Sequence, residues 1–213
     1  MTIRVLLADD HAVVRAGVKA LLQQDADISV VGEAANGRDA VRFALELKPD
    51  VVVMDVTMPE LNGVEAARLL RDKWPAIRVV ILSMHSSSEY VFRAVEAGAV
   101  GFILKNAGGG EVAAAVRAVH AGGRYFSPAL AEFKLTAQSR TGRASPLDSL
   151  SAREYQVLQL VVEGHSSAEI AASIHLSPKS VETYRGRLMK KLTVNNVAGL
   201  VRFAIEHGLT PSS

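Results

Sequence analysis

Five short apolar runs in the first half of the chain constrain its fold more than any other feature. They are Ile3–Ala8, Ile28–Glu33, Val51–Met54, Ile77–Leu82 and Val100–Leu104. The segments between them place apolar residues at helical spacing, as at Val41 and Leu45. Near-continuous apolar strands that alternate with helices are typical of a parallel sheet covered on both faces. We therefore predict a doubly wound α/β domain with a five-stranded parallel sheet.

The pattern changes after Gly122-Gly123-Arg124, and this change divides the chain. Small and polar residues predominate between Pro128 and Pro146, as in a linker. Beyond them only helical spacing remains, opening with the capping-box pair Ser151 and Glu154. Further helices are predicted at Ser167–Ser173, Pro178–Lys191 and Asn195–His207. We expect the α/β domain at residues 1–124, a linker at 125–147 and a small all-α domain of four helices at 148–213.

Composition excludes several classes of protein. The 213 residues contain no cysteine, which excludes disulfides, thiolate metal sites and cysteine nucleophiles. The N-terminus MTIRVLLADD reaches charged residues too early for a secretory signal, and no apolar run approaches membrane-spanning length. We therefore expect a cytoplasmic protein with no membrane partner. The formal net charge of +2 and the mildly basic last third are compatible with nucleic-acid binding.

Charged and hydroxyl side chains follow four of the five predicted strands. The first strand runs into Asp9-Asp10, the third into Asp55, the fourth into Ser83 and the fifth into Lys105. Parallel strands end at one edge of a sheet, where ligands bind in such folds, so we expect these residues to converge. Crowded carboxylates repel one another, and we expect one of them to take a raised pKa unless a cation intervenes. A site with only oxygen ligands suits Mg²⁺. Lys105 supplies the fixed positive charge that a transferred phosphoryl group requires.

The first domain resembles the receiver domain of bacterial two-component response regulators. The resemblance rests on the order and spacing of Asp9-Asp10, Asp55 followed by Met58-Pro59, Ser83 and Lys105. It implies a flavodoxin-like fold in which Asp55 is the phospho-acceptor and receives a phosphoryl group from a sensor histidine kinase. It also implies an Mg²⁺ ion held by Asp10, Asp55 and the backbone carbonyl of Thr57, with Asp9 acting through water.

The same resemblance implies a switch. Ser83 is expected to hydrogen-bond the new phosphoryl oxygen and Lys105 to pair with it, so both join Asp55 at the reaction centre. Phe102 occupies the position of the family's aromatic switch residue and is expected to swing inward on phosphorylation. Phenylalanine keeps the ring of the more frequent tyrosine but lacks its hydroxyl. Asn106 follows the lysine where many receivers carry proline.

The stretch HSSAEIAASIHLSPKSVETYRGRLMKKL, His165 to Leu192, has the pattern of two helices joined by a tight turn. Ser177 is placed to cap the second helix, with Pro178 at its first position. That helix carries Val181 and Leu188 on one face and polar and basic residues on the other. This distribution is typical of a helix-turn-helix.

The segment Leu150 to Val194 resembles the LuxR-type four-helix DNA-binding domain. With the receiver, it makes the chain resemble a NarL/FixJ-family response regulator. By that resemblance, one set of residues faces base edges in the major groove: Glu182, Thr183 and Gly186. A second set meets mostly phosphates: Lys179, Arg185, Arg187 and Lys190. The last helix contributes the dimer contact, for which we single out Val197, Leu200 and Val201.

We therefore expect a DNA-binding transcriptional regulator, not an enzyme, in which phosphorylation of Asp55 alters dimerisation and promoter binding. Its expected partners are a sensor histidine kinase, double-stranded promoter DNA and a second copy of the chain, with RNA polymerase as a further candidate. Two other interpretations stay open. The first is an Mg²⁺-dependent phosphohydrolase that uses Asp55 as nucleophile. The second is a constitutive DNA binder whose receiver domain serves only as a scaffold.

Overall fold

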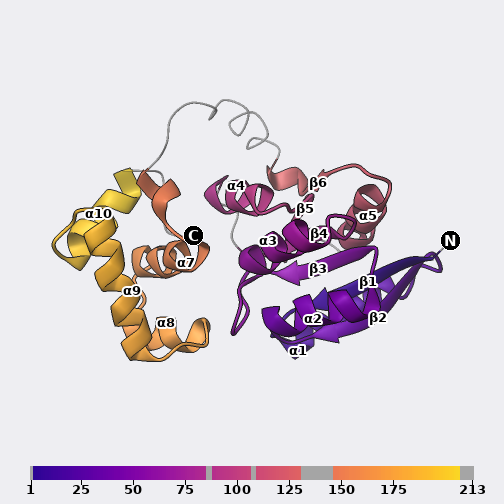
Figure 1. Cartoon of the computed structure of the whole chain (residues 1–213), viewed down its shortest axis with the longest axis horizontal. Helices are drawn as coiled ribbons and strands as arrows, with labels where there is room; N and C mark the ends of the chain where they lie inside the picture. The colour runs from indigo at the N-terminus through magenta and orange to yellow at the C-terminus, as the bar shows by residue number, and fades with distance from the viewer. Residues whose placement is uncertain (1, 85–87, 107–108, 131–145, 207–213) are drawn as a thin grey trace. The chain divides into compact units, whose positions relative to one another are not determined.

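The computed structural model describes residues 2–84, 88–106, 109–130 and 146–206, which are drawn in colour in Figure 1. The chain forms two compact units, Met1–Ser139 and Arg140–Ser213. Both predicted architectures are present: a parallel α/β sheet domain in the first unit and a helical domain in the second. Most of the segment predicted as a linker, residues 131–145, lies outside the described residues. The predicted domain limits therefore stay a prediction.

The first unit is built on a parallel sheet with the strand order β2-β1-β3-β4-β5-β6. Its first five strands are β1 (Ile3–Ala8), β2 (Ile28–Ala34), β3 (Val51–Asp55), β4 (Arg78–Ser83) and β5 (Gly101–Leu104). Each begins and ends within one residue of the predicted apolar run. The central strand β3 is buried along its whole length, because it has a strand on either side and helices on both faces.

A sixth strand, β6 (Tyr125–Phe126), extends the sheet beyond the predicted five. It pairs in parallel with β5, with Gly101 opposite Tyr125 and Phe102 opposite Phe126. A 3-10 turn, η1 (Pro128–Leu130), follows it. The sequence predicts a linker from residue 125 onward, and a run of two residues is too short to show the alternation that marks a strand. Tyr125 and Phe126 form a strand because β5 offers them the unpaired backbone groups of a sheet edge.

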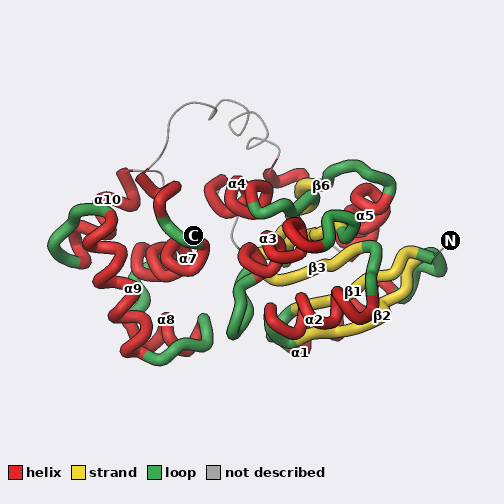
Figure 2. Tube along the Cα trace, viewed as in Figure 1, coloured by secondary structure: helices red, strands yellow, loops and turns green. Residues whose placement is uncertain are grey.

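Within the described residues, five α-helices cover the sheet (Figures 1 and 2). They are α1 (Ala12–Leu22), α2 (Gly37–Leu47), α3 (Gly63–Lys73), α4 (Ser88–Glu96) and α5 (Gly109–His120). Helices α1 and α5 pack together on one face, and α2, α3 and α4 lie on the other. The core under α1 and α5 includes Val53 of the central strand and Val116 of α5, both fully buried. The sheet is therefore covered on both sides, as predicted.

The second unit contains η2 (Pro146–Ser149), α7 (Ala152–Val162), α8 (Ser167–Ser173), α9 (Pro178–Lys191) and α10 (Val197–Glu206). Ser151 and Glu154 form the predicted capping box of α7, and Ser166 and Glu169 form a second one at α8. All four helices contribute to one core, whose fully buried members include Tyr155, Ile170, Val181, Leu188 and Leu200. No helix in the described part of the chain has both the length and the apolar character needed to cross a membrane.

Candidate functional site

Three strand ends bring charged side chains together at the carboxyl edge of the sheet. Asp9 directly follows β1, Asp55 is the last residue of β3, and Lys105 directly follows β5. The ammonium Nζ of Lys105 lies 2.8 Å from Asp9 Oδ2 and 2.9 Å from Asp55 Oδ2. All three side chains are almost fully buried. Two carboxylates from different strands therefore share one cation.

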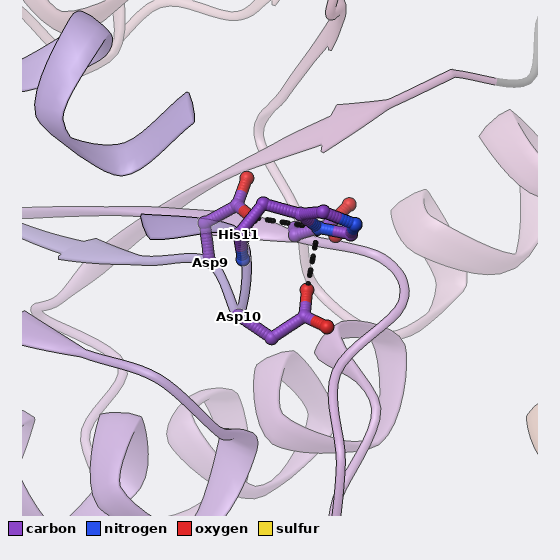
Figure 3. Close-up of side chains that lie close together, drawn as sticks. Asp9, Asp10 and His11 are labelled. Carbon is purple, nitrogen blue, oxygen red and sulfur yellow. Dashed lines mark hydrogen bonds and ion pairs between the residues drawn. The ribbon is translucent and has the colours of Figure 1, made fainter. Parts of the chain in front are cut away.

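Asp10 and His11 join the two carboxylates Asp9 and Asp55 in a cluster of four residues, and Figure 3 shows the three of them that follow β1. One ligand atom each from Asp9, Asp10, His11 and Asp55 lies within 4.8 Å of the others. His11 Nδ1 lies 2.9 Å from Asp10 Oδ1 and 3.3 Å from Asp9 Oδ1. The backbone N–H of His11 also donates to Asp9 Oδ1 at 2.8 Å. The sequence prediction omitted His11, because its place depends on how the chain turns into α1.

Burial has the largest effect on the ionisation of Asp55. It raises the pKa of this carboxyl to about 6, and the negative charge of Asp9 adds to the rise, while Lys105 opposes it. The backbone N–H of Thr57 also donates to Asp55 and favours its ionised form. Burial by itself would lower the pKa of Lys105, but its two carboxylate partners outweigh burial and raise that pKa. The site therefore keeps a fixed cation beside a carboxyl that ionises close to neutral pH.

The turn after β3 holds the backbone of Asp55 from one side. The N–H of Gly63 donates to the Val56 carbonyl at 2.8 Å. A Cβ atom at Gly63 would lie 2.0 Å from the Asp55 carbonyl oxygen, so only glycine fits there. The neighbouring Asn62 is buried and caps α3 by accepting from the Glu65 N–H at 2.8 Å. The Asn62-Gly63 pair thus fixes the position of the residue at the end of β3.

Ser83 is the last residue of β4, whereas Phe102 is the second residue of β5 and pairs with Ile81. Ser83 is buried and comes one residue after Leu82, which pairs with Asp55 in the sheet. The Ser83 carbonyl accepts the Lys105 N–H at 2.8 Å, which joins the ends of β4 and β5. Phe102 is fully buried. Its ring points inward in this conformation, and its role as the aromatic switch residue stays a prediction.

The acidic cluster fits a divalent cation. Asp9, Asp10 and Asp55 lie together, and Lys105 pairs with only two of these three carboxylates, Asp9 and Asp55. The pocket therefore keeps an excess of negative charge in a largely buried position, where uncompensated charge is costly. Carboxylate oxygens are the ligands that Mg²⁺ prefers. Asp9, Asp10 and Asp55 are the residues placed to hold such an ion. The sequence also predicts the backbone carbonyl of Thr57 as a ligand, and this assignment stays a prediction.

In the second unit, α8 and α9 form a helix pair joined by a short turn. Val181 and Leu188 of α9 are fully buried, so the apolar face of this helix points into the domain. Ser177 caps α9 by accepting from the Ser180 N–H at 3.0 Å, and Pro178 occupies the first turn. This is the helix-turn-helix arrangement that the sequence predicts.

The opposite face of α9 is exposed along the helix. Six of the predicted DNA contacts are exposed on it: Lys179, Glu182, Thr183, Gly186, Arg187 and Lys190. A Cβ atom at Gly186 would meet nothing within 4 Å, so the helix surface is open at that position. The predicted base-facing and phosphate-facing residues therefore share one accessible helix face, with Arg185 as the exception.

Arg185 is held inside the helix pair. Its side chain is 16% exposed, and its guanidinium donates to Ser167 Oγ of α8 and lies 3.3 Å from Glu182 Oε1. In this conformation the guanidinium is not placed to meet a phosphate. Sequence spacing predicts where a residue lies on a helix, but it does not predict a side chain that turns toward a neighbouring helix.

The predicted dimer residues of α10 separate into two groups. Leu200 is fully buried in the core of its own domain and is not available to a partner in this conformation. Val197 is exposed and Val201 is half-buried, so the predicted dimer surface is reduced to these two. An apolar helix stripe looks the same in the sequence whether it packs inward or against a second chain.

Comparison with known proteins agrees with both parts of the site. Residues 5–117 match the family model of the response regulator receiver domain, and residues 148–204 match the model of the bacterial regulatory proteins of the luxR family. The chain is 40% identical to the response regulator GacA of Pseudomonas aeruginosa over 99% of both proteins. It is 38% identical to the response regulator UvrY of Escherichia coli, over 97% of this chain and 95% of that protein.

Among solved structures, the response regulator ChrA of a heme-sensing two-component system shares 34% identity with this chain. The similarity covers 98% of both chains, with a TM-score of 0.53. It therefore extends over the sheet domain and the helical domain together. The chain belongs to the NarL/FixJ family of two-component response regulators, which join a receiver domain to a LuxR-type helix-turn-helix domain.

Proposed function

We propose that this chain is a transcriptional regulator that binds promoter DNA and is switched by phosphorylation of Asp55. One observation carries the proposal: the Lys105 ammonium lies 2.9 Å from Asp55 at a strand edge with a surplus of carboxylates. Such a site offers an acceptor oxygen, a fixed cation and ligands for a metal ion. Phosphoryl transfer depends on positioning and charge neutralisation, and these groups supply both.

In the proposed reaction, a carboxylate oxygen of Asp55 attacks the phosphorus of a phosphohistidine on a sensor histidine kinase. The phosphorus–nitrogen bond breaks as the phosphorus–oxygen bond forms, and the imidazole leaves with the bonding electrons. Lys105 pairs with one phosphoryl oxygen, and Ser83 donates its hydroxyl to another. Asp10, Asp55 and the Thr57 carbonyl would hold an Mg²⁺ ion, with Asp9 acting through water, and the ion would supply charge neutralisation at the phosphoryl group.

The proposed reader of DNA is α9. Glu182 would accept from a cytosine amino group, the Thr183 methyl would meet a thymine methyl, and Gly186 would allow close backbone approach. Lys179, Arg187 and Lys190 would meet phosphates, which contribute affinity and salt dependence but little sequence information. The exposed face of α9 supports this assignment, because all six residues lie on it.

A two-state receiver would link the phosphorylated site to DNA binding. The Lys105 N–H and the Ser83 carbonyl are hydrogen-bonded, so a shift of either residue toward the phosphoryl group moves the ends of β4 and β5 together. The altered surface is proposed to change homodimerisation and so the affinity for a promoter with two half-sites. Val197 and Val201 are the proposed dimer contacts of α10, and RNA polymerase is a proposed partner at the promoter.

The acceptor is tested with wild type, Asp55→Asn and Asp50→Asn, each treated with a small phosphodonor and Mg²⁺ and weighed by intact-protein mass spectrometry. Asp50 is the matched control because it precedes the other end of β3, where it accepts the Arg4 N–H at 2.8 Å. We expect wild type and Asp50→Asn to gain a phosphoryl group and Asp55→Asn to gain none. Undiminished incorporation into Asp55→Asn would refute the acceptor assignment.

The output is tested by selecting binding sites from random duplexes, with and without the phosphodonor. We expect phosphorylation to raise the affinity of wild type, but not of Asp55→Asn, for the selected sites. Binding that ignores phosphorylation would favour a constitutive DNA binder with a scaffold receiver. Turnover of an external phosphoester together with no duplex selection would favour the phosphohydrolase.

A further inference from the structure

We propose that Ser167 and Arg185 are positioning residues that hold the Glu182 carboxylate in the orientation that reads a base. The three residues form a bridge between α8 and α9, called here the Ser167 bridge. The inference rests on the proposed DNA-binding function and adds a determinant of its sequence specificity. It also replaces the phosphate contact that the sequence predicts for Arg185.

The hydrogen bonds of the Ser167 bridge converge on one carboxylate oxygen. The Arg185 guanidinium donates to Ser167 Oγ, and the Ser167 hydroxyl donates to Glu182 Oε1. The same Arg185 nitrogen lies 3.3 Å from Glu182 Oε1. Because a serine hydroxyl has a single proton, its bond to Glu182 and its acceptance from Arg185 together fix the direction of the hydroxyl. None of these bonds uses Oε2, which is left for an acceptor contact.

The two charged residues of the Ser167 bridge differ in how much of each side chain is exposed. The Glu182 side chain is 62% exposed, whereas that of Arg185 is 16% exposed. Arg185 Nε is buried and has no hydrogen-bond partner among the described residues. The carboxylate is therefore presented on the open face of α9, while the guanidinium behind it is enclosed. An arginine that contacts a DNA phosphate would instead present its guanidinium on the exposed face of the helix.

The bridge lowers two free-energy costs that a glutamate side chain meets when it approaches DNA. A free glutamate on a helix surface loses rotamer freedom when it binds, and a side chain already held in place loses less. A carboxylate is also repelled by the phosphates, and Arg185 offsets its charge at 3.3 Å. A surface pair on one helix has little effect by itself, but Ser167 ties this pair to a second helix. The base that matches a held carboxylate is cytosine, through its exocyclic amino group.

The test uses full-length Ser167→Ala, Glu182→Gln and the double variant, with Ser173→Ala as matched control. Ser173 lies on the same helix, but its hydroxyl donates at 3.0 Å to the Ile170 carbonyl within α8. Sites are first selected with wild type, and each base pair of the selected site is then substituted in competition assays. We expect Ser167→Ala to lose about three- to tenfold discrimination at the position that Glu182→Gln also relaxes. The double variant should lose no more than Glu182→Gln, and Ser173→Ala should match wild type.

Arg185→Lys separates a positioning role from a phosphate contact. Lysine keeps the positive charge and still serves a phosphate, but it lacks the planar fork. We expect this variant to relax the same base position as Ser167→Ala while the salt dependence of binding stays unchanged. Lys190→Ala is the reference for a phosphate contact, with a log–log salt slope smaller by about 1 and an unchanged base preference.

Suppose that Glu182→Gln relaxes the preference at one base position. The inference would be overturned if Ser167→Ala or Arg185→Lys kept the wild-type base preference at that position. An unchanged preference in Glu182→Gln would also overturn it, because Glu182 would then read no base. Failure of the proposed function is a different result: wild type would select no sequence, and Lys190→Ala would bind duplexes as wild type does.

Discussion

Lys105 Nζ contacts Asp55 Oδ2 at 2.9 Å across the tip of β4, the strand that separates β3 from β5 in the sheet. The same nitrogen reaches Asp9, at the end of β1, at 2.8 Å. One side chain thus connects the ends of three strands that are far apart in the sequence. Any group added to Asp55 must be accommodated between these contacts.

Removal of the Lys105 charge is expected to slow phosphorylation while leaving the acceptor in place. In Lys105→Met, we expect phosphoryl incorporation from a small phosphodonor to fall by about 100-fold, because no fixed cation meets the phosphoryl oxygen. Rates are measured by intact mass, with the exposed Lys73→Met as control. A wild-type rate in Lys105→Met would show that the contact serves only the stability of the receiver.

The raised pKa of Asp55 predicts a pH dependence of stability in metal-free protein. The folded-state pKa of about 6 exceeds the ordinary value of 3.8, so the folded chain binds this proton more tightly than the unfolded chain. The resulting stabilisation is fully present below pH 3.8 and is lost as the pH rises through 6. Asp55→Asn carries no such charge, and we expect it to be about 2–3 kcal/mol more stable than wild type at pH 7.5 in a chelator.

Urea unfolding followed by fluorescence of Trp74, the sole tryptophan, reports on the receiver unit in this comparison. The advantage of Asp55→Asn should shrink as the pH falls from 7 to 4, and Mg²⁺ should stabilise wild type but not the variant at high pH. Parallel pH profiles for the two proteins would contradict the assigned pKa.

Gly63 is expected to be irreplaceable, because a Cβ atom there would lie 2.0 Å from the Asp55 carbonyl oxygen. Gly63→Ala must displace the end of β3 or the start of α3, and we expect a loss of about 2 kcal/mol or more. The matched control is Gly17→Ala in α1, where a Cβ atom meets nothing within 4 Å. That change should stabilise the receiver by about 0.5–1 kcal/mol. Equal effects of the two changes on urea unfolding would contradict the close approach.

Glu154 is expected to stabilise the second unit through its ion pair with Lys191 at 2.7 Å. Burial opposes ionisation of Glu154, but Lys191 and the Ser151 N–H outweigh it and lower the pKa. This contribution is therefore present above the ordinary value of 4.5 and is lost as the pH falls through the lower folded-state pKa. Glu154→Gln keeps the capping box but loses the ion pair, at a cost of about 1 kcal/mol.

Glu169→Gln is the control for this prediction, because Glu169 forms the same capping box at α8 and its lowered pKa is due to Ser166. Hydrogen exchange of α7 and α9 peptides, read by mass spectrometry at pH 7, should increase more in Glu154→Gln than in Glu169→Gln. Equal exchange in both variants would assign the effect to the cap alone.

Gly186→Ala is expected to separate helix stability from DNA approach. The position is open and lies in the interior of α9, so alanine should stabilise the helix by about 0.5–1 kcal/mol. If α9 enters the groove at Gly186, the added methyl group should weaken binding to the selected duplex by about tenfold, or about 1.4 kcal/mol. The affinity for the selected duplex is measured by electrophoretic mobility assays, with Gly17→Ala as the control. Undiminished binding by Gly186→Ala would show that this part of α9 does not approach DNA closely.

Local sequence patterns predict five of the six strands, the helices of both units and the convergence of Asp9, Asp55 and Lys105 at one sheet edge. These features depend on local periodicity and on caps within a few residues, as at Ser151 and Ser177. The parallel sheet then follows from the alternation of strands and helices, and it brings all strand ends to the same side. No contact between distant side chains has to be known for these predictions.

Which side chains meet across the fold depends on tertiary packing. Packing places His11 in the acidic cluster, turns Arg185 from the open face of α9 toward Ser167, and buries Leu200 in its own domain. It also makes a strand of Tyr125–Phe126 by offering the free edge of β5. Each outcome depends on partners far away along the chain, and local spacing carries no information about which partner lies nearest after folding.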